Sequence, residues 1–208
     1  MQDGIPAAGP DIRFVDAMLR RRLSPLARMS LHVAHACSDG LPQLRLVFAS
    51  RHGELNRTMV MLRQLAQGEP LSPTAFSLSV HNTAAGIFSI LREDRSPATA
   101  IAAGDETLGC ALLEASCQLD AEPGLPVLVV YGDEPLPEEY RGYATGPEPH
   151  HALAVLLAPD AGRSIEFEVS ASGRDAPSPG PQSLAFLPGL TAGRGGCWTG
   201  SQHTWTWH

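Results

Sequence analysis

Short apolar runs alternate with helical patterns along the chain up to residue 131. Three of these runs predict buried strands, because each is only a few residues long and is bounded by polar or turn-forming residues. They cover Leu44–Ser50, Ala98–Ala103 and Val127–Tyr131. The second run is apolar on both faces of an extended chain, which predicts a central strand.

The segments between these runs carry the period and the boundary residues of helices. In residues 25–37 apolar side chains recur at helical spacing, and Ser24-Pro25 suits the start of a helix. The helices that we predict cover residues 13–22, 25–37, about 54–67, 82–91 and 107–119. Because strand and helix signals alternate and no repeat is present, we predict one α/β domain over residues 1–208.

The pattern is less regular after residue 131. Residues 132–149 hold four prolines and five acids and predict an irregular excursion. The elements expected beyond it are strands at His151–Leu157 and Ile165–Ser170, a loop at 175–181, a flexible stretch at 193–196, and a terminal strand at Trp205–Trp207 that packs against the sheet.

The composition is that of a soluble globular protein. Of the 208 residues 43% are hydrophobic and 18% are charged, and no apolar run approaches the roughly 20 residues that span a bilayer. The first residues lack the basic start and the apolar core of a signal peptide, so we expect a cytoplasmic protein. A net charge of −7 argues against non-specific nucleic-acid binding.

The positive charge is concentrated near the N-terminus. The chain has no lysine, and residues 11–63 contain nine arginines against four acids. Arg20, Arg21 and Arg22 form a run that Arg28 follows. Two interpretations stay open for these four residues: a solvated helix face, or a docking surface for an acidic carrier protein.

The cysteines and histidines do not form a metal-binding motif. The four cysteines contain no C-x-x-C pair, so a structural zinc site is not expected. Cys110 and Cys117 lie seven residues apart in a predicted helix, and we interpret them as small buried hydrophobic residues. The alternative, Cys110 as a displaced nucleophile, is less favoured. His32 and His35 are interpreted as ordinary helix residues.

The region from Ser72 to Cys117 holds a set of residues at fixed spacing. Ser72-Pro73 and Phe76 precede an Asn-x-x-Ala-Gly-x-x-Ser-Ile pattern, and Pro97 follows it. The pattern consists of Asn82, Ala85, Gly86, Ser89 and Ile90. This ordered combination resembles the first half of a β-ketoacyl synthase, and the resemblance is good over residues 43–131. It implies a thiolase-like α/β fold, truncated to about one ketosynthase half.

The position of the ketosynthase nucleophile carries no cysteine in this chain. In the family that cysteine lies eight residues past the proline, where this sequence has Asp105, followed by Glu106. A carboxylate cannot replace a thiolate in thioester exchange, because an acyl anhydride would be hydrolytically labile. Acids in the first turn also stabilise a helix, so both residues have a structural explanation. The family's two catalytic histidines are missing as well, since only His150-His151 invites comparison.

The resemblance therefore implies a non-catalytic chain length factor. Such a subunit pairs with a competent β-ketoacyl synthase and shapes its acyl tunnel in polyene or fatty-acid-like (type II polyketide) biosynthesis, together with an acyl carrier protein. The chain is similar to the short ketosynthase-like subunits of aryl polyene pigment pathways. Two alternatives stay open: a decarboxylase or acyl-transfer variant, and a stand-alone acyl-binding or carrier-binding protein. We expect no cofactor, no metal and no catalysis by the chain alone.

The family meets its second subunit through the helix 82–91 and the strand after Pro97. Asn82, Thr83, Ile87 and Phe88 are therefore candidates for the interface and for the far end of the partner's acyl tunnel. Ile87 and Phe88 are equally well explained as core residues. A half-length chain lacks the second half that covers the far side of the sheet, so we expect it to depend on its partner.

Overall fold

A computed structural model describes residues 9–144, 149–159, 162, 164–173 and 176–208. Its main sheet has four strands in the order β2-β1-β3-β4. These strands are β1 (Arg45–Ala49), β2 (Ala98–Ile101), β3 (Val127–Asp133) and β4 (His151–Leu157). β2 and β3 both pair in parallel with β1, and β4 pairs antiparallel with β3.

A second, antiparallel sheet is formed by the C-terminal part of the chain. Its strands are β5 (Phe167–Ala171), β6 (Gly196–Thr199) and β7 (His203–Trp207), with β7 in the middle. The helices are α1 (Ala17–Arg20), α2 (Pro25–Cys37), α3 (Leu55–Ala66), α4 (Pro73–Ser77), α5 (Thr83–Arg92), α6 (Thr107–Ala121) and α7 (Gln182–Ala192). Two 3-10 helices, η1 (Gly104–Glu106) and η2 (Glu138–Tyr143), complete the set.

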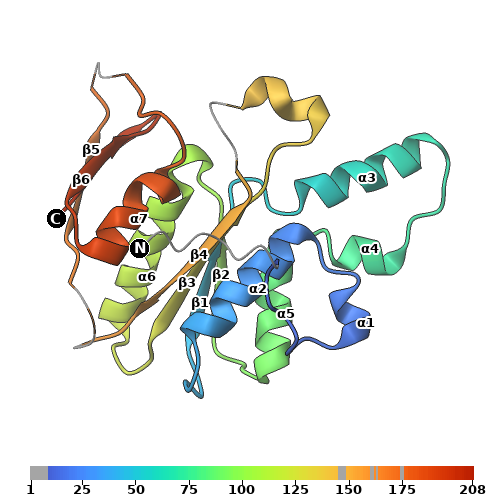
Figure 1. Ribbon diagram of the computed structural model, residues 1–208, viewed down its shortest axis with the longest axis horizontal. Helices are drawn as coiled ribbons and strands as arrows, with labels where there is room; N and C mark the ends of the chain where they lie inside the picture. The colour runs from blue at the N-terminus through green and yellow to red at the C-terminus, as the bar shows by residue number, and fades with distance from the viewer. Residues whose placement is uncertain (1–8, 145–148, 160–161, 163, 174–175) are drawn as a thin grey trace.

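The elements stack in four layers (Figure 1). Helices α2 and α5 cover one face of the main sheet, α6 and α7 cover the other, and the second sheet packs outside α6 and α7. The alternation along β1 explains this arrangement, because Leu46 and Phe48 enter one core while Val47 and Ala49 enter the other. Burying each large apolar side chain contributes about 1.5–3 kcal/mol.

Polar side chains fix the ends of two of the covering helices. Ser24 caps α2 by accepting from the Ala27 amide at 3.0 Å, and Pro25 follows at the first helical position. The buried Arg45 donates to three carbonyl oxygens at the C-terminal end of α6. These belong to Gln118, Glu122 and Leu125, at 2.6, 2.5 and 2.5 Å. Since the last carbonyls of a helix lack partners within it, Arg45 ties α6 to the sheet.

Most predicted strands and helices are confirmed, with differences at particular positions. The strand 151–157 and the three runs before it are present, and the α/β class is confirmed. The helix predicted at 13–22 is reduced to α1, because Asp16 caps Met18 and Leu19 and so starts the helix later. Residues 132–149 are not wholly irregular: β3 extends to Asp133 and η2 follows. The strand expected at 165–170 begins at Phe167.

Three predictions are wrong in a way that matters for function. The strand after Pro97 is not central: β2 lies at the edge of the main sheet, and Ala98 and Ala100 are exposed. The stretch 193–196 is not a flexible loop throughout, since Gly196 begins β6. The far side of the main sheet is also not left open, because α6 and the second sheet cover it. The premise for partner dependence that rested on an uncovered sheet is therefore wrong.

The cysteines of α6 also differ from the prediction. Cys117 is exposed and so does not belong to the core, whereas Cys110 is half-buried and packs against the core beneath α6. The buried stripe of α6 consists instead of Leu108, Ala111, Leu112 and Ala115, which recur at helical spacing beside them. In the described part of the chain, none of the helices has the length and apolar character needed to cross a bilayer.

Candidate functional site

The carboxyl end of β2 turns sharply into α6, and this turn holds the two acids singled out in the sequence. Gly104 adopts a positive φ of 59°, and the 3-10 turn η1 follows it directly. Thr107 fastens the turn: its hydroxyl donates to the Gly104 carbonyl at 2.7 Å and accepts from the Ala103 amide at 2.9 Å. Asp105 and Glu106 thus lie at a strand-to-helix elbow, as expected from the sequence.

Asp105 is held by the C-terminal part of the chain. Its carboxylate accepts from the Ser201 amide at 2.9 Å and from the Ser201 hydroxyl at 3.0 Å. Asp105 also lines a cavity of about 200 Å³, to which Arg51, Tyr131 and Trp198 contribute. Trp198 and Thr199 of β6 therefore bring the second sheet into the wall of this cavity.

Glu106 is buried and accepts four hydrogen bonds from the same segment. Oε1 accepts from the amides of Gln202 and His203 at 3.0 and 2.8 Å. Oε2 lies 2.7 Å from Nδ1 of His203 and accepts from the Trp205 indole at 3.2 Å. Burial alone would raise the pKa of Glu106, but the donors, above all His203, outweigh it and lower this pKa. Glu106 is thus an ionised anchor for the turn between β6 and β7.

The elbow carries Asp105 and Glu106 and no cysteine. Both carboxylates accept hydrogen bonds from the chain itself. Cys110 lies about one turn further along α6, where burial and then the charge of Glu106 raise the pKa of its thiol. A raised pKa keeps the sulfur protonated and poorly nucleophilic. His203, which the sequence reasoning missed, is the histidine that contacts the elbow, and it is engaged by Glu106.

A buried polar network lies beside the elbow, where β1 and β3 end. Asp133 accepts from the Ser50 hydroxyl at 3.0 Å, from Nε of Arg51 at 2.7 Å and from the Tyr131 hydroxyl at 2.5 Å. Burial, and then the charge of Asp133, raise the pKa of Tyr131, so the phenol stays protonated and donates. His151 adds a contact of 2.6 Å between Nε2 and the Ser183 hydroxyl. His150 points elsewhere and lines a separate groove.

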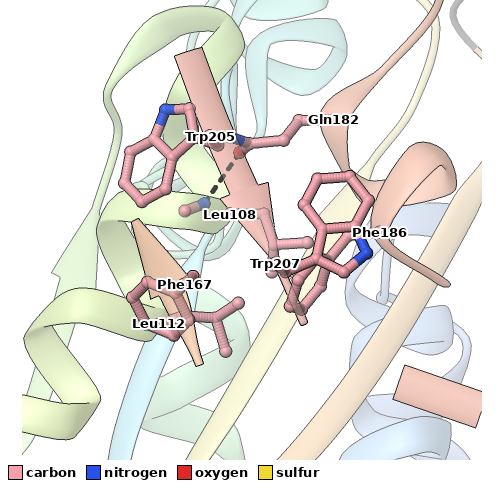
Figure 2. A pocket seen from close by; sticks show the side chains of 8 residues that line it. Leu108, Leu112, Phe167, Gln182, Phe186, Trp205 and Trp207 are labelled. Atoms are coloured by element: carbon pink, nitrogen blue, oxygen red, sulfur yellow. Dashed lines mark hydrogen bonds between the residues drawn. The ribbon is translucent and has the colours of Figure 1, made fainter. Parts of the chain in front are cut away.

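Aromatic side chains fill the space between α6, α7 and the second sheet (Figure 2). The residues that meet there are Leu108, Leu112, Phe167, Phe186, Trp205 and Trp207. Gln182 accepts from the Gly109 amide at 2.7 Å and so satisfies an amide in the first turn of α6. A β-carbon at Gly109 would come within 2.8 Å of the Trp205 ring, so glycine is required for this approach. The packing leaves little free space over α6.

Helix α5 places the four interface candidates on different sides. Thr83, Ile87 and Phe88 are buried in the core of the chain itself, and Arg92 lies over the Phe88 ring at 5.3 Å. Asn82 is exposed. Ile90, eight residues further along α5, is 75% exposed. Sequence spacing could have linked Asn82 with Ile90 through Gly86, because residues four apart are neighbours on a helix surface and all three are exposed.

The other sequence candidates lie at the N-terminal helices. Arg28 donates to the carbonyls of Leu23 and Arg20 at 3.2 and 2.9 Å, so it braces the turn between α1 and α2. Arg21 and Arg22 are exposed, and Arg20 is partly exposed. His32 contacts the Asp11 carbonyl at 3.1 Å, and His35 stacks on the Phe14 ring.

Apolar side chains are exposed on the helices between β1 and β2. They are Val60, Leu62 and Leu65 of α3, Phe76 of α4, Val80 and Ile90, each at least 43% exposed. In Figure 1 the pair α3–α4 extends away from the main sheet and leads into α5. Open strand edges and exposed apolar surfaces are each typical of protein interfaces.

Comparison with known proteins places this geometry in a family. The model of the β-ketoacyl synthase N-terminal domain matches residues 2–208. The chain belongs to the β-ketoacyl synthase family. The family match therefore also covers the residues after 131, where the resemblance seen in the sequence ends. The fold is thiolase-like.

Solved structures also relate this chain to ketosynthases. A chain of the complex of a ketosynthase (ApeO) with its chain length factor (ApeC) from Xenorhabdus doucetiae is 30% identical, with a TM-score of 0.82. The match covers 93% of this family member and 81% of that chain. No curated protein sequence matches this chain significantly.

Two more distant structures share the fold alone. The ishigamide ketosynthase/chain length factor is 18% identical with a TM-score of 0.53, over 71% of this chain and 49% of that one. A β-ketoacyl synthase from Burkholderia phymatum STM815 is 11% identical with a TM-score of 0.54, over 68% and 38%. This ketosynthase-like chain spans about half or less of the length of these two chains.

Proposed function

We propose that this chain is a non-catalytic chain length factor, which pairs with a competent β-ketoacyl synthase and shapes its acyl tunnel. The observation that carries the proposal is the occupied elbow. At the position of the family's nucleophile the chain has Asp105 and Glu106, and Ser201 and His203 hold both carboxylates. A family member that keeps the fold and lacks the reactive group is suited to support catalysis in another subunit.

The free edge of β2 supports the pairing. Pro97 and Ile101 direct their carbonyls toward β1, where they accept from Leu46 and Ser50 at 3.1 and 3.2 Å. Because bonding groups alternate along a strand, the amides of Ala98 and Ala100 face the open edge. A strand of the ketosynthase can add there. The relative from Xenorhabdus doucetiae, itself described as part of such a pair, agrees with this role.

The exposed face of α5 is the part of the chain best suited to reach the partner's tunnel. Asn82 and Ile90 are exposed on it, and Gly86 between them adds no side chain. Thr83, Ile87 and Phe88 pack into the core on the opposite side of α5 and so hold the helix in position. We propose that Ile90 closes the far end of the tunnel by excluded volume, with Asn82 beside it.

The finer parts of the role are proposals as well. The exposed Arg21 and Arg22 suit the docking of an acidic acyl carrier protein, with Arg20 beside them and Arg28 as a brace. The resemblance to the ketosynthase-like subunits of aryl polyene pathways supports a place of this chain in that biosynthesis.

The pairing is tested by removing one amide from the open edge. Ala100→Pro deletes the outward N–H and leaves the bonds of Pro97 and Ile101 to β1 in place. Ala100→Ser keeps the amide and serves as the matched control. With a competent β-ketoacyl synthase from the same organism immobilised on a biosensor, we expect binding of the wild type and of Ala100→Ser, and at least tenfold weaker binding of Ala100→Pro. Wild-type protein that does not bind, or equal binding of all three proteins, would overturn the proposal.

A further inference from the structure

A groove of about 750 Å³ lies between α3 and the segment that follows β3. One wall is formed by Met59, Val60 and Met61 of α3, and the other by residues 135–137. An ion pair between Arg63 and Glu139 joins the two walls. The groove is separate from the elbow cavity, because the two share no lining residue.

Glu134 lines this groove and is 94% buried, since only 6% of its surface is exposed. Its Oε1 is out of contact with solvent, and no donor among the described residues forms a hydrogen bond with it. A buried carboxylate oxygen without a donor lowers the stability of the chain that contains it. Such a group calls for a ligand that supplies the missing donor.

The charged side chains near Glu134 do not supply a donor for its Oε1. Glu54 is also buried, and it accepts from the Ser24 hydroxyl at 2.6 Å and from Nε of Arg57 at 3.3 Å. Arg57 is further engaged by the carbonyl of Arg22 at 2.7 Å. Burial raises the pKa of Glu54, and the charge of the nearby Glu134 adds to this rise.

The charge balance of the groove favours a cation. The charged side chains that line it are Arg57, Arg63, Arg141, Glu134 and Glu138. Arg57 and Arg63 are paired with Glu54 and Glu139, which lie outside the lining. This leaves Glu134 and Glu138 against Arg141, a surplus of one negative charge, and Glu134 is the buried member of the three.

The surroundings favour a protein segment over a small molecule. Methionine and arginine are enriched in protein interfaces, and both occur along the groove together with the 52% exposed Val60. Ser72 and Ala75 of α4 also line the groove, and the exposed Phe76 is adjacent to them. The groove therefore borders the exposed apolar side chains of α3 and α4.

We propose that the groove receives an extended segment of the ketosynthase subunit, and that an arginine or lysine of this segment donates to Glu134. This inference rests on the proposed pairing and adds a second contact to it, remote from the β2 edge. Glu134 is then destabilising in the isolated chain and stabilising in the complex.

Glu134→Gln tests the inference, because it removes the charge and keeps the shape. The matched control is Glu138→Gln, which removes an exposed carboxylate from the same groove. On a biosensor carrying the ketosynthase, we expect Glu134→Gln to weaken binding at least tenfold, mainly through faster dissociation. Glu138→Gln should stay within twofold of the wild type. In thermal unfolding of the isolated chain, Glu134→Gln should have a Tm equal to or above that of the wild type.

The outcomes separate this inference from the pairing itself. If the wild type binds, Ala100→Pro does not, and Glu134→Gln binds as tightly as the wild type, the pairing stands and the groove contact is wrong. If Glu134→Gln lowers both the Tm and the affinity, Glu134 is a structural residue and the inference is also wrong. A photo-crosslinking residue at Val60 gives an independent check. Adducts with a ketosynthase peptide support the contact, and adducts only with a second copy of this chain contradict it.

Discussion

Replacing Glu106 by glutamine should loosen the second sheet from α6. Glutamine keeps the shape of the side chain, and its carbonyl can still accept from the amides of Gln202 and His203. The amide nitrogen then takes the place of Oε2, which accepts from the buried Trp205 indole at 3.2 Å. The indole N–H of Trp205 then has no acceptor and points at the N–H groups of the new amide.

The cost can be worked out from these contacts. A hydrogen bond to a charged group contributes about 1.5–3 kcal/mol, and a buried donor without a partner costs about 1–3 kcal/mol. His203 offsets part of the loss, because its half-exposed ring can turn and accept from the new amide. We expect Glu106→Gln to lower the free energy of unfolding by about 2–4 kcal/mol, a large part of the about 5–15 kcal/mol typical of a domain.

Urea unfolding followed by tryptophan fluorescence measures this difference. Asp105→Asn is the control, since Asp105 is more exposed and, among the described residues, accepts side-chain hydrogen bonds from Ser201 alone; it should cost less than about 1 kcal/mol. A Glu106→Gln variant within about 0.5 kcal/mol of the wild type would refute the anchoring role.

The pH dependence gives a second check of the same anchor. The folded-state pKa of Glu106 is lowered, so its stabilising contribution is present above the unfolded pKa of about 4.3. It is lost as the pH falls through the folded pKa. The difference in unfolding free energy between wild type and Glu106→Gln should therefore be largest near pH 7 and shrink below about pH 4.

Three further predictions concern packing and the tunnel. Gly109→Ala should lower the unfolding free energy by about 1–3 kcal/mol in urea titrations, because its β-carbon would meet the Trp205 ring at 2.8 Å. Gly86→Ala is the control: its β-carbon would have no neighbour within 4 Å, so the variant should be neutral or more stable. Arg45→Met should lower the Tm by several degrees in calorimetry, since the carbonyls of Glu122 and Leu125 lose their donor and that of Gln118 loses one of two. Ile90→Ala in the reconstituted pair should lengthen the products seen by mass spectrometry, and unchanged lengths would contradict the tunnel role.

The sequence was sufficient where local patterns determine the structure. The strands β1, β3 and β4 are short apolar runs, and the elbow at Asp105 follows from a strand, a glycine and acids in a first helical turn. Helix α7 was missed, because Pro188 and Gly189 lie inside it and normally indicate a break. The edge position of β2 was missed as well, since an apolar run does not show how many neighbours a strand has.

The candidate site could be located from the sequence, and its role could not. Asp105 and Glu106 meet partners 96 to 99 residues away, and no local pattern reveals contacts of that range. The same limit applies to α5. Helical spacing shows that Thr83 and Ile87 share a face, and only the tertiary packing shows that this face is turned into the core.

Native mass spectrometry of the reconstituted pair tests the central claim most directly. The chain and a competent β-ketoacyl synthase from the same organism are mixed, incubated with an acyl carrier thioester, and weighed first as a complex and then as separate subunits. We expect a complex of one copy of each subunit, with the acyl mass on the ketosynthase alone and none on the 22.1 kDa chain. An acyl adduct on this chain, at Asp105, Glu106 or Cys110, or two subunits that never associate, would contradict it.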